Sequence, residues 1–370
     1  MQRLTYLNGL KGWCAISACL IHFLLIFAID GYIGWKCLPE ASLQPFSYYW
    51  NWFPYSAFLN TSFPLYLFFA IISYLVCYLF FKKNDENKIK QNIIMRYFRL
   101  LPLVLVLCLA SYLLLKFKLC PLQEFYDITG NTWGYARLEE SYTLFDALKI
   151  SFFTAFFEGT QLVSAFWCLH YIFLGSILVY ITMLIYNKLS NKTLFFIFLV
   201  LLFFFIDQTY LSFIAGIIAA IITNKEPAIT KSTGVLLIIG GCVLGLFPSV
   251  LLPKFINIVT LYAIGTIFIL VGTHCCFSNS RLLCNSFIEF LGKESFSTIA
   301  WQMLVLQSLN IFLHNYFYKL GMDNIINVSI NLVVNIGVSL LLVWIHSKTI
   351  TPLTNHLCSR VRMLLWENNK

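Results

Sequence analysis

The sequence predicts an all-α membrane protein with about ten transmembrane helices, both termini in the cytoplasm and no fused soluble domain. Two observations predict this class. First, the 370 residues are 59% hydrophobic and 11% charged, whereas soluble domains carry roughly 25% charged residues. Second, apolar runs long enough to cross a bilayer recur along the whole chain, with polar connections between them.

Eight of these runs have the spanning length of about 20 residues. They lie at about 11–30, 60–81, 97–117, 164–186, 233–251, 256–276, 294–316 and 324–347. A further run, from Thr193 to Thr223, is too long for one helix, and Asp207 and Gln208 interrupt it, so we expect two short helices there. The spans predict a transmembrane domain over residues 1–350 and a cytoplasmic tail over 351–370.

The distribution of Lys and Arg predicts the orientation, because short cytoplasmic loops carry an excess of both residues. Most of the 25 Lys and Arg residues lie in alternate connections, on the side of the N-terminus. This bias explains the formal net charge of +9 through topology and anionic lipid, so nucleic-acid binding gains no support. We therefore expect a multi-pass protein of the cell membrane, either a bacterial inner membrane or a plasma membrane.

The predicted external connections carry two further features. Most of the 12 cysteines lie in or beside apolar runs, but Cys37 and Cys120 do not, and they would pair if their connections meet. The polar stretch at about 118–160 combines aromatic residues with Glu139 and Glu140. That combination suits sugar binding, although an aromatic belt at the membrane interface has the same composition.

His22 is the clearest ionisable residue inside an apolar run, and such residues indicate function by default. It follows Lys11 by eleven residues, a rise of about 16.5 Å, which places it near the bilayer midplane. Eleven helical steps also return to within roughly 20° of the same direction, so Lys11 and His22 share a helix face. The alternative is a histidine that only hydrogen-bonds to a neighbouring helix.

Arg96 and Arg99 begin the third apolar run, at the predicted cytoplasmic depth of Lys11. A spacing of three residues puts both guanidinium groups on one helix face, where they would hold phosphate groups together with Lys11. The alternative is a positive anchor at the inner membrane surface. A second buried histidine, His170, follows Trp167 in the fourth run, and both a partly hydrated role and structural hydrogen bonding are open for it.

No G-x-S-x-G, Walker loop, H-E-x-x-H or Cys-x-x-Cys occurs in the sequence. These motifs are typical of soluble hydrolases, of nucleotide hydrolysis and of metal centres, so none of those functions gains support and we expect no metal site.

Four segments in a fixed order carry a more specific signal. They are Tyr6-Leu7-Asn8-Gly9-Leu10-Lys11-Gly12-Trp13 followed by His22-Phe23, Arg96-Tyr97-Phe98-Arg99-Leu100-Leu101-Pro102, Trp167-Cys168-Leu169 with Gly175-Ser176, and Leu291-Gly292-Lys293-Glu294-Ser295-Phe296-Ser297. Over nearly the whole chain this combination resembles acyltransferase family three, integral-membrane proteins that transfer acetyl or related groups to cell-surface glycans. The resemblance implies an O-acyltransferase with cytoplasmic acetyl-CoA, or another acyl-CoA, as co-substrate, no permanently bound cofactor and a glycan acceptor.

The resemblance also implies roles for single residues. His22 would be the catalytic base, and Lys11, Arg96 and Arg99 would bind the donor or support the oxyanion. Residues on the acceptor side, or with a structural role, would be Trp167, His170, Ser295 and Gln302. Because the chain ends soon after the last span, transfer would finish within the membrane domain or with a separate extracytoplasmic partner.

The chain departs from the family's pattern at four places. The usual arginine of the first helix is Lys11, a glutamate after the tryptophan motif falls on Ile172, and a second histidine falls on Gln302. The usual Ser-Gly after Phe68-Phe69 is altered around Ile72-Ser73. What orients the imidazole of His22 is then open, with His170 as a candidate for part of that role.

Two alternative functions differ in class or family. A transporter or flippase of a glycan or lipid-linked intermediate also uses buried His and Arg, but it is expected to have Gly- or Pro-broken helices in matching positions of two halves, which the sequence lacks. A membrane-bound acyltransferase of another family usually carries its histidine late in the chain, whereas His22 lies in the first helix.

Overall fold

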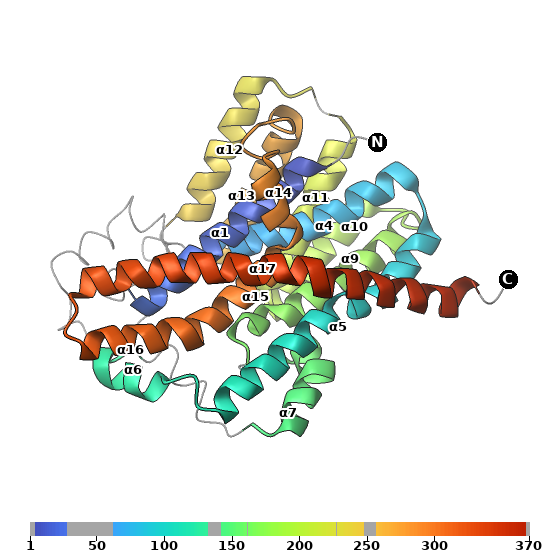
Figure 1. The fold of residues 1–370 in the computed structure, drawn as a ribbon. Coiled ribbons are helices and arrows are strands. Elements are labelled where there is room, and N and C mark those ends of the chain that lie inside the picture. Colours follow the sequence, from blue (N-terminus) through green and yellow to red (C-terminus); the bar gives the residue numbers. More distant parts are fainter. Residues whose placement is uncertain are drawn as a thin grey trace. The chain divides into compact units, whose positions relative to one another are not determined.

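The computed structural model describes residues 4–27, 62–131, 142–160, 162–226, 228–247 and 257–367, and helix is the only regular secondary structure in these residues. Figure 1 shows the helices along the chain, which divides into two compact units. The first unit comprises Met1–Ile16, Asn60–Tyr97 and Tyr171–Ser295. The second unit comprises Ser17–Leu59, Phe98–His170 and Phe296–Lys370.

Seven helices within the described ranges are long and apolar enough to cross a membrane. They are α1 (Thr5–Phe27), α4 (Phe63–Lys83), α5 (Glu86–Lys116), α9 (Leu169–Tyr186) with the 3-10 turn before it (Ser164–Cys168), α13 (Ile258–Cys276), the continuous segment α15 (Ser295–Val305), η8 (Leu306–Asn310) and α16 (Ile311–Lys319), and α17 (Asn324–Arg362) with its last π turn (Met363–Glu367). The predicted all-helical class with helices of spanning length is therefore confirmed.

Three further apolar helices are shorter: α10 (Lys192–Ile206), α11 (Leu211–Asn224) and α12 (Lys231–Leu246). With 15 and 16 residues, α10 and α12 measure about 22 to 24 Å, less than the roughly 30 Å of a hydrocarbon core. The predicted break at Asp207 is confirmed. The Asp207 carboxylate accepts a hydrogen bond from the Thr209 N–H at 2.9 Å and caps the turn that leads into α11.

The start of α5 lies well before the predicted boundary at residue 97. The Asp85 carboxylate accepts the Lys88 N–H at 2.9 Å, a capping bond that allows a helix to begin in polar sequence. The basic segment before Arg96 is therefore helical. Hydropathy alone could not locate this start, because it detects the apolar part of a helix only.

At the other end of the chain, α17 continues past the predicted boundary at 347 and reaches Arg362, with Pro352 inside the helix. Asp323 caps its first turn by accepting the N–H groups of Ile325 and Ile326. Part of the segment predicted as a tail is thus an extension of the last long helix.

Short helices occupy the connection between α5 and α9. They are α6 (Leu122–Thr129), α7 (Leu144–Lys149), the π turn η4 (Ile150–Thr154) and α8 (Ala155–Phe157). Thr143 and Asp146 form a capping box at α7, and the hydrogen bonds from Thr143 lower the pKa of the Asp146 carboxyl. Glu139 and Glu140, predicted to suit sugar binding, lie outside the described residues.

The predicted pairing of Cys37 with Cys120 also falls partly outside the described residues, because Cys37 does. Cys120 is a free thiol just before α6. Burial raises the pKa of Cys120 to about 12, so the thiolate that disulfide exchange requires is scarce at neutral pH.

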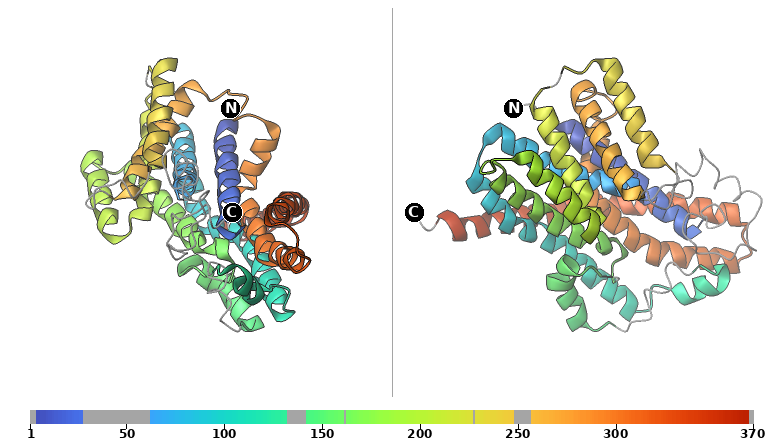
Figure 2. Two further views of the ribbon diagram at one scale, coloured as in Figure 1. Left: turned by 90° about the vertical axis from the view of Figure 1, so that its left-hand side faces the viewer. Right: turned by 180° about the vertical axis from the view of Figure 1, so that it is seen from behind.

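In the first unit, α11 packs on α4 and α13, α12 packs on α13, and α10 packs on α11 (Figure 2). Glycines bring α12 and α13 into backbone contact. A Cβ atom on Gly241 would lie 2.7 Å from the Gly265 carbonyl oxygen, and one on Gly272 would lie 2.7 Å from that of Gly234. Small residues of this kind allow close packing of helices in lipid, where the hydrophobic effect gives little drive for association.

In the second unit, α16 packs on α17 and α6 (Figure 1). Aromatic rings fill the contact, since Phe27 and Phe125 both lie against His314, with ring centroids 5.5 and 5.0 Å away. The Asn131 amide donates to the Ile26 carbonyl at 3.0 Å and ties the α6 segment to the second-unit part of α1.

We predict that Gly241→Ala lowers the stability of the first unit by about 1–3 kcal/mol, the usual cost of overpacking, because the new methyl group meets the Gly265 carbonyl oxygen and the Ile269 side chain, both at 2.7 Å. The matched control is Gly240→Ala. Its methyl group would meet only the Phe268 ring, at 3.6 Å, so the higher helix propensity of Ala should leave stability equal or slightly increased. Thermal unfolding of the detergent-solubilised variants measures the difference, and equal stability of the two would contradict the close packing.

Candidate functional site

Two of the motif segments lie against each other in the first unit. The start of α1 packs on α14 (Ser286–Lys293) and on the turn before it, at glycines that leave no room for a side chain. A Cβ on Gly9 would overlap the Leu283 carbonyl, one on Gly12 the Ile288 carbonyl, and one on Gly292 the Asn8 carbonyl. Segments about 280 residues apart in the sequence are thus held backbone to backbone.

This packing gathers a charged cluster, which we define as Lys11, Arg96, Lys293 and Glu294. The charges of the other three residues act on Lys11, repulsively from Arg96 and Lys293 and attractively from Glu294. Lys293 is itself paired with Glu289 at 3.0 Å on α14. Glu294 lies in the break between α14 and α15 and adds a negative charge to the predicted convergence of basic residues.

The predicted convergence of two arginines with Lys11 is thus found for Arg96 within the first unit. Arg99 belongs to the second unit, where it is exposed and interacts with the Cys358 thiol of α17, close to Arg362. Ser295, the first residue of α15, is buried directly after the charged cluster.

His22 and Gln302 belong to the second unit. His22 is half-buried in α1, and its Nδ1 atom is inaccessible to solvent. Gln302 of α15 is 1% exposed, and its amide donates to the Cys19 carbonyl at 3.0 Å, three residues before His22 on the same helix. The Gln302 Oε1 atom is buried without a hydrogen-bond partner among the described residues.

Gln302 also begins a chain of buried carboxamides, which we call the amide ladder; its members are Gln302, Asn335, Asn310, Asn331 and Asn327. Gln302 donates to Asn335 at 3.4 Å and Asn335 donates to Asn310 at 2.9 Å. Asn310 donates to Asn331 at 3.0 Å and Asn331 donates to Asn327 at 2.9 Å. The ladder ends where the Asn327 amide donates to the His314 carbonyl at 3.1 Å.

The amide ladder was not predicted from the sequence, although the spacing of its asparagines is a signal for it. Asn327, Asn331 and Asn335 are four residues apart in an apolar run, which places them on one helix face. Asn310, which joins the ladder from the other side, ends the π turn η8, and π turns inside helices are frequent at functional positions.

Trp167 and His170 lie at the start of α9, in the second unit. Trp167 is 43% exposed in the 3-10 turn. His170 is half-buried against the turn at Gly159, where a Cβ atom would lie 3.2 Å from the imidazole Nδ1. Gly159 has φ +75°, a conformation that favours glycine, so this turn and the ring position depend on each other. Ile172, where the resemblance places a carboxylate, is a buried apolar residue of the first unit.

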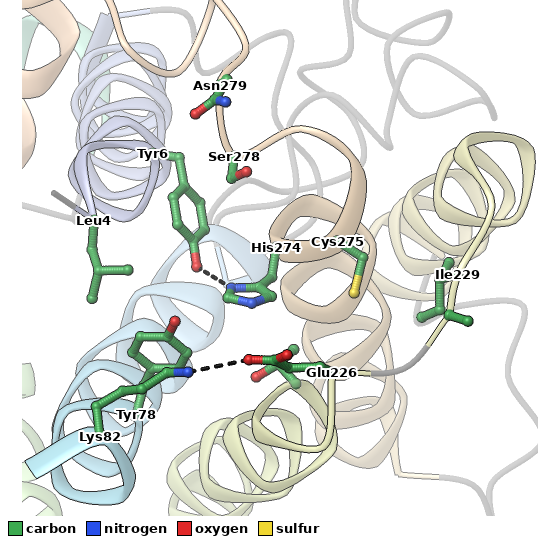
Figure 3. Close-up of a pocket in the computed structure, with 12 residues that line it drawn as sticks. Leu4, Tyr6, Tyr78, Lys82, Glu226, Ile229, His274, Cys275, Ser278 and Asn279 are labelled. Carbon is green, nitrogen blue, oxygen red and sulfur yellow. Dashed lines mark hydrogen bonds and ion pairs between the residues drawn. The ribbon is translucent and has the colours of Figure 1, made fainter. Parts of the chain in front are cut away.

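A polar cavity of about 390 Å³ in the first unit was not predicted as a site (Figure 3). It lies at the last turns of α4 and α13, which carry Lys82 and His274. Its polar lining includes Tyr6, Tyr78, Lys82, Glu226, His274 and Ser278. Lys82 and Glu226 form an ion pair at 3.3 Å, and both side chains are exposed, so the pair contributes little to stability.

Two tyrosine hydroxyls meet the same ring nitrogen of His274. The Tyr6 oxygen lies 2.7 Å from His274 Nδ1, and the Tyr74 oxygen lies 2.9 Å from it. Tyr74 is held in turn by a hydrogen bond with the Thr223 hydroxyl at 2.9 Å. These contacts occupy Nδ1 and hold the imidazole in place at the cavity.

Among the residues that the structure describes, no group of three or more His, Cys, Asp or Glu side chains lies together in a way that would hold a metal ion. Comparisons of the chain with protein-family models, with curated proteins and with solved structures find no match.

We predict that Asn310→Leu destabilises the second unit, because it leaves the Asn335 amide without its acceptor and removes the side-chain donor to Asn331. Each buried polar group without a partner costs about 1–3 kcal/mol. The control is Ser329→Leu on the exposed face of α17, which adds the same side chain outside the ladder. The apparent melting temperature in detergent should fall for the first variant only, and equal values would show that the ladder contributes nothing.

Proposed function

We propose that the chain is a membrane-embedded O-acyltransferase that moves an acetyl or similar short acyl group from cytoplasmic acyl-CoA to a hydroxyl of a cell-surface or exported glycan. The observation that carries this proposal is the packing of the α1 motif on the α14 motif, which gathers the charged cluster. The α1 motif and the α14 motif both resemble segments of one family, and a shared donor site would explain why they lie in contact.

Lys11 and Arg96 supply the positive charge that a phosphorylated donor requires, and Arg96 adds the planar donor geometry that suits phosphate oxygens. Glu294 limits the repulsion between them while the site is empty. Its carboxylate allows Lys11 and Arg96 to lie close together when no anion is bound. Without a negative charge beside them, the repulsion between the two cations would raise the free energy of the empty site.

His22 is proposed as the general base. The acceptor hydroxyl passes its proton to the imidazole as its oxygen attacks the thioester carbonyl carbon. The tetrahedral intermediate then collapses, the carbon–sulfur bond breaks, and the CoA thiolate leaves and takes up the proton. An apolar surrounding favours the neutral imidazole that this step requires.

The finer topology belongs to the same proposal. The three shorter helices α10, α11 and α12 would complete ten transmembrane segments, with both termini in the cytoplasm. The distribution of Lys and Arg supports this orientation. It places the charged cluster on the cytoplasmic side, where acyl-CoA is available.

We predict that His22→Ala abolishes acyl transfer while the protein still reaches the membrane. Surface glycans from cells with either form are compared by mass spectrometry for acetyl ester, and loss of the general base should remove at least 99% of the ester, since such bases contribute about 10²–10⁴-fold. His356→Ala changes an exposed histidine of α17 in the same way and should leave acetylation intact. Full acetylation in the first variant would reject His22 as the base. Unchanged ester with reduced glycan at the surface would instead favour a transporter.

We predict that Arg96→Ala raises the KM for acyl-CoA about tenfold or more, because a hydrogen bond to a charged group contributes about 1.5–3 kcal/mol. Arg281→Ala is the matched control, since Arg281 is an exposed arginine on a predicted cytoplasmic turn. Initial rates in proteoliposomes with the donor on one side provide the KM values. Equal values for the two variants would return Arg96 to the role of a positive membrane anchor.

A further inference from the structure

The cavity around His274 has a lining that neither the charged cluster nor the amide ladder uses. Figure 3 shows the imidazole between the loop that carries Ser278 and the Lys82–Glu226 pair. Its volume of about 390 Å³ lies within the roughly 300–1,000 Å³ typical of small-molecule sites.

One part of the lining suits a primary ammonium group. The Glu226 carboxylate accepts hydrogen bonds, the His274 imidazole lines the cavity beside it, and an ammonium group has three N–H donors. The Tyr78 ring adds an aromatic face that already attracts a cation, because the Lys82 ammonium lies 5.6 Å from its centroid. The contacts of Tyr6 and Tyr74 with Nδ1 hold the imidazole in place, so this part of the site is prepared before a ligand binds.

Another part suits an anionic group. Lys82 provides the positive charge, and Ser278 and Asn279 provide a hydroxyl and an amide on the turn after α13. The side chains of Lys82 and Glu226 are both exposed, so their ion pair contributes little to stability. The pair can therefore open to receive a ligand at a small cost in free energy.

The balance of charge selects the ligand. With His274 neutral, one lysine and one glutamate give the lining no net charge. A phosphate alone would be repelled by Glu226 and a cation alone by Lys82. A molecule with both charges can pair its cationic group with Glu226 and its anionic group with Lys82, in place of the ion pair between these two side chains.

We propose that this cavity binds a small zwitterion that carries a primary ammonium group and a phosphate, as in phosphoethanolamine. The group can come from a free metabolite or from the headgroup of phosphatidylethanolamine. Both sources present an ammonium group and a phosphate to the cavity, and the phosphate monoester of the free metabolite carries up to one more negative charge than the phosphodiester of the headgroup. The ends of two long apolar helices are where headgroups would be met.

Binding of soluble phosphoethanolamine to the purified full chain in detergent, measured by isothermal titration calorimetry, tests the proposal. We expect saturable binding that weakens at least tenfold in Glu226→Gln and in Lys82→Gln, whereas Lys83→Gln, a neighbouring exposed lysine outside the cavity, binds like the unchanged protein. Phosphocholine has no N–H donor and should bind at least tenfold more weakly. Melting temperatures of all variants are compared first, and if Glu226→Gln or Lys82→Gln proves unstable, the comparison of phosphoethanolamine with phosphocholine on the unchanged protein still tests the ammonium site.

A second arm distinguishes the two sources. In nanodiscs of phosphatidylglycerol with and without phosphatidylethanolamine, a headgroup site would lose its apparent affinity for soluble phosphoethanolamine when the lipid is present, and a metabolite site would not. Absence of saturable binding, equal binding of inorganic phosphate, or unchanged binding in Glu226→Gln would overturn the proposal.

Discussion

The satisfaction of polar groups inside apolar surroundings is the constraint on which the second unit depends. Five carboxamides lie buried between α15, η8 and α17, and each donates to the next. In hydrocarbon or in a packed core, a group left without a partner costs more than a made hydrogen bond returns. The ladder therefore fixes the register of these helices, because a shift of one residue along α17 would break several bonds together.

The first unit solves the packing problem differently. Its contacts depend on the absence of side chains, since glycines let α12 meet α13 and let α1 meet α14 at the level of the backbone. The second of these contacts has a consequence for the site. Lys11 and Glu294 come together because Gly9, Gly12 and Gly292 allow the two segments to approach, so the glycines of the motifs are as necessary for the charged cluster as the charges are.

Much of the fold could be predicted from the sequence because hydropathy and helix length are local properties. The break at Asp207 is an example, since a carboxylate in an apolar run has few options other than to cap a helix. The start of α5 depends on the capping residue Asp85, which a hydropathy pattern does not detect, whereas α17 begins at the predicted residue 324.

The site was less predictable because its residues come from distant segments. Arg96 and Arg99 are indeed three residues apart on one helix, but only Arg96 belongs to the unit that contains Lys11. His274 gave a weak signal in the sequence, as a histidine near a helix end. Its importance comes from Tyr6, Tyr74 and Thr223, which approach it from three other helices, and no sequence pattern relates these positions.

Gln302 shows how a departure from a family's pattern can follow from local structure. The resemblance places a second histidine at this position, yet the Gln302 amide donates both of its hydrogens, one to the Cys19 carbonyl of α1 and one to Asn335 of the ladder. A neutral imidazole has a single N–H and could make only one of these bonds. Because both bonds are buried, an imidazole at this position would leave either the Cys19 carbonyl or the Asn335 side chain without its donor. Cys19 lies three residues before His22 on α1. The glutamine is thus the residue that joins α1 to the ladder, and the rigidity of the ladder extends through it to the helix that carries the proposed base.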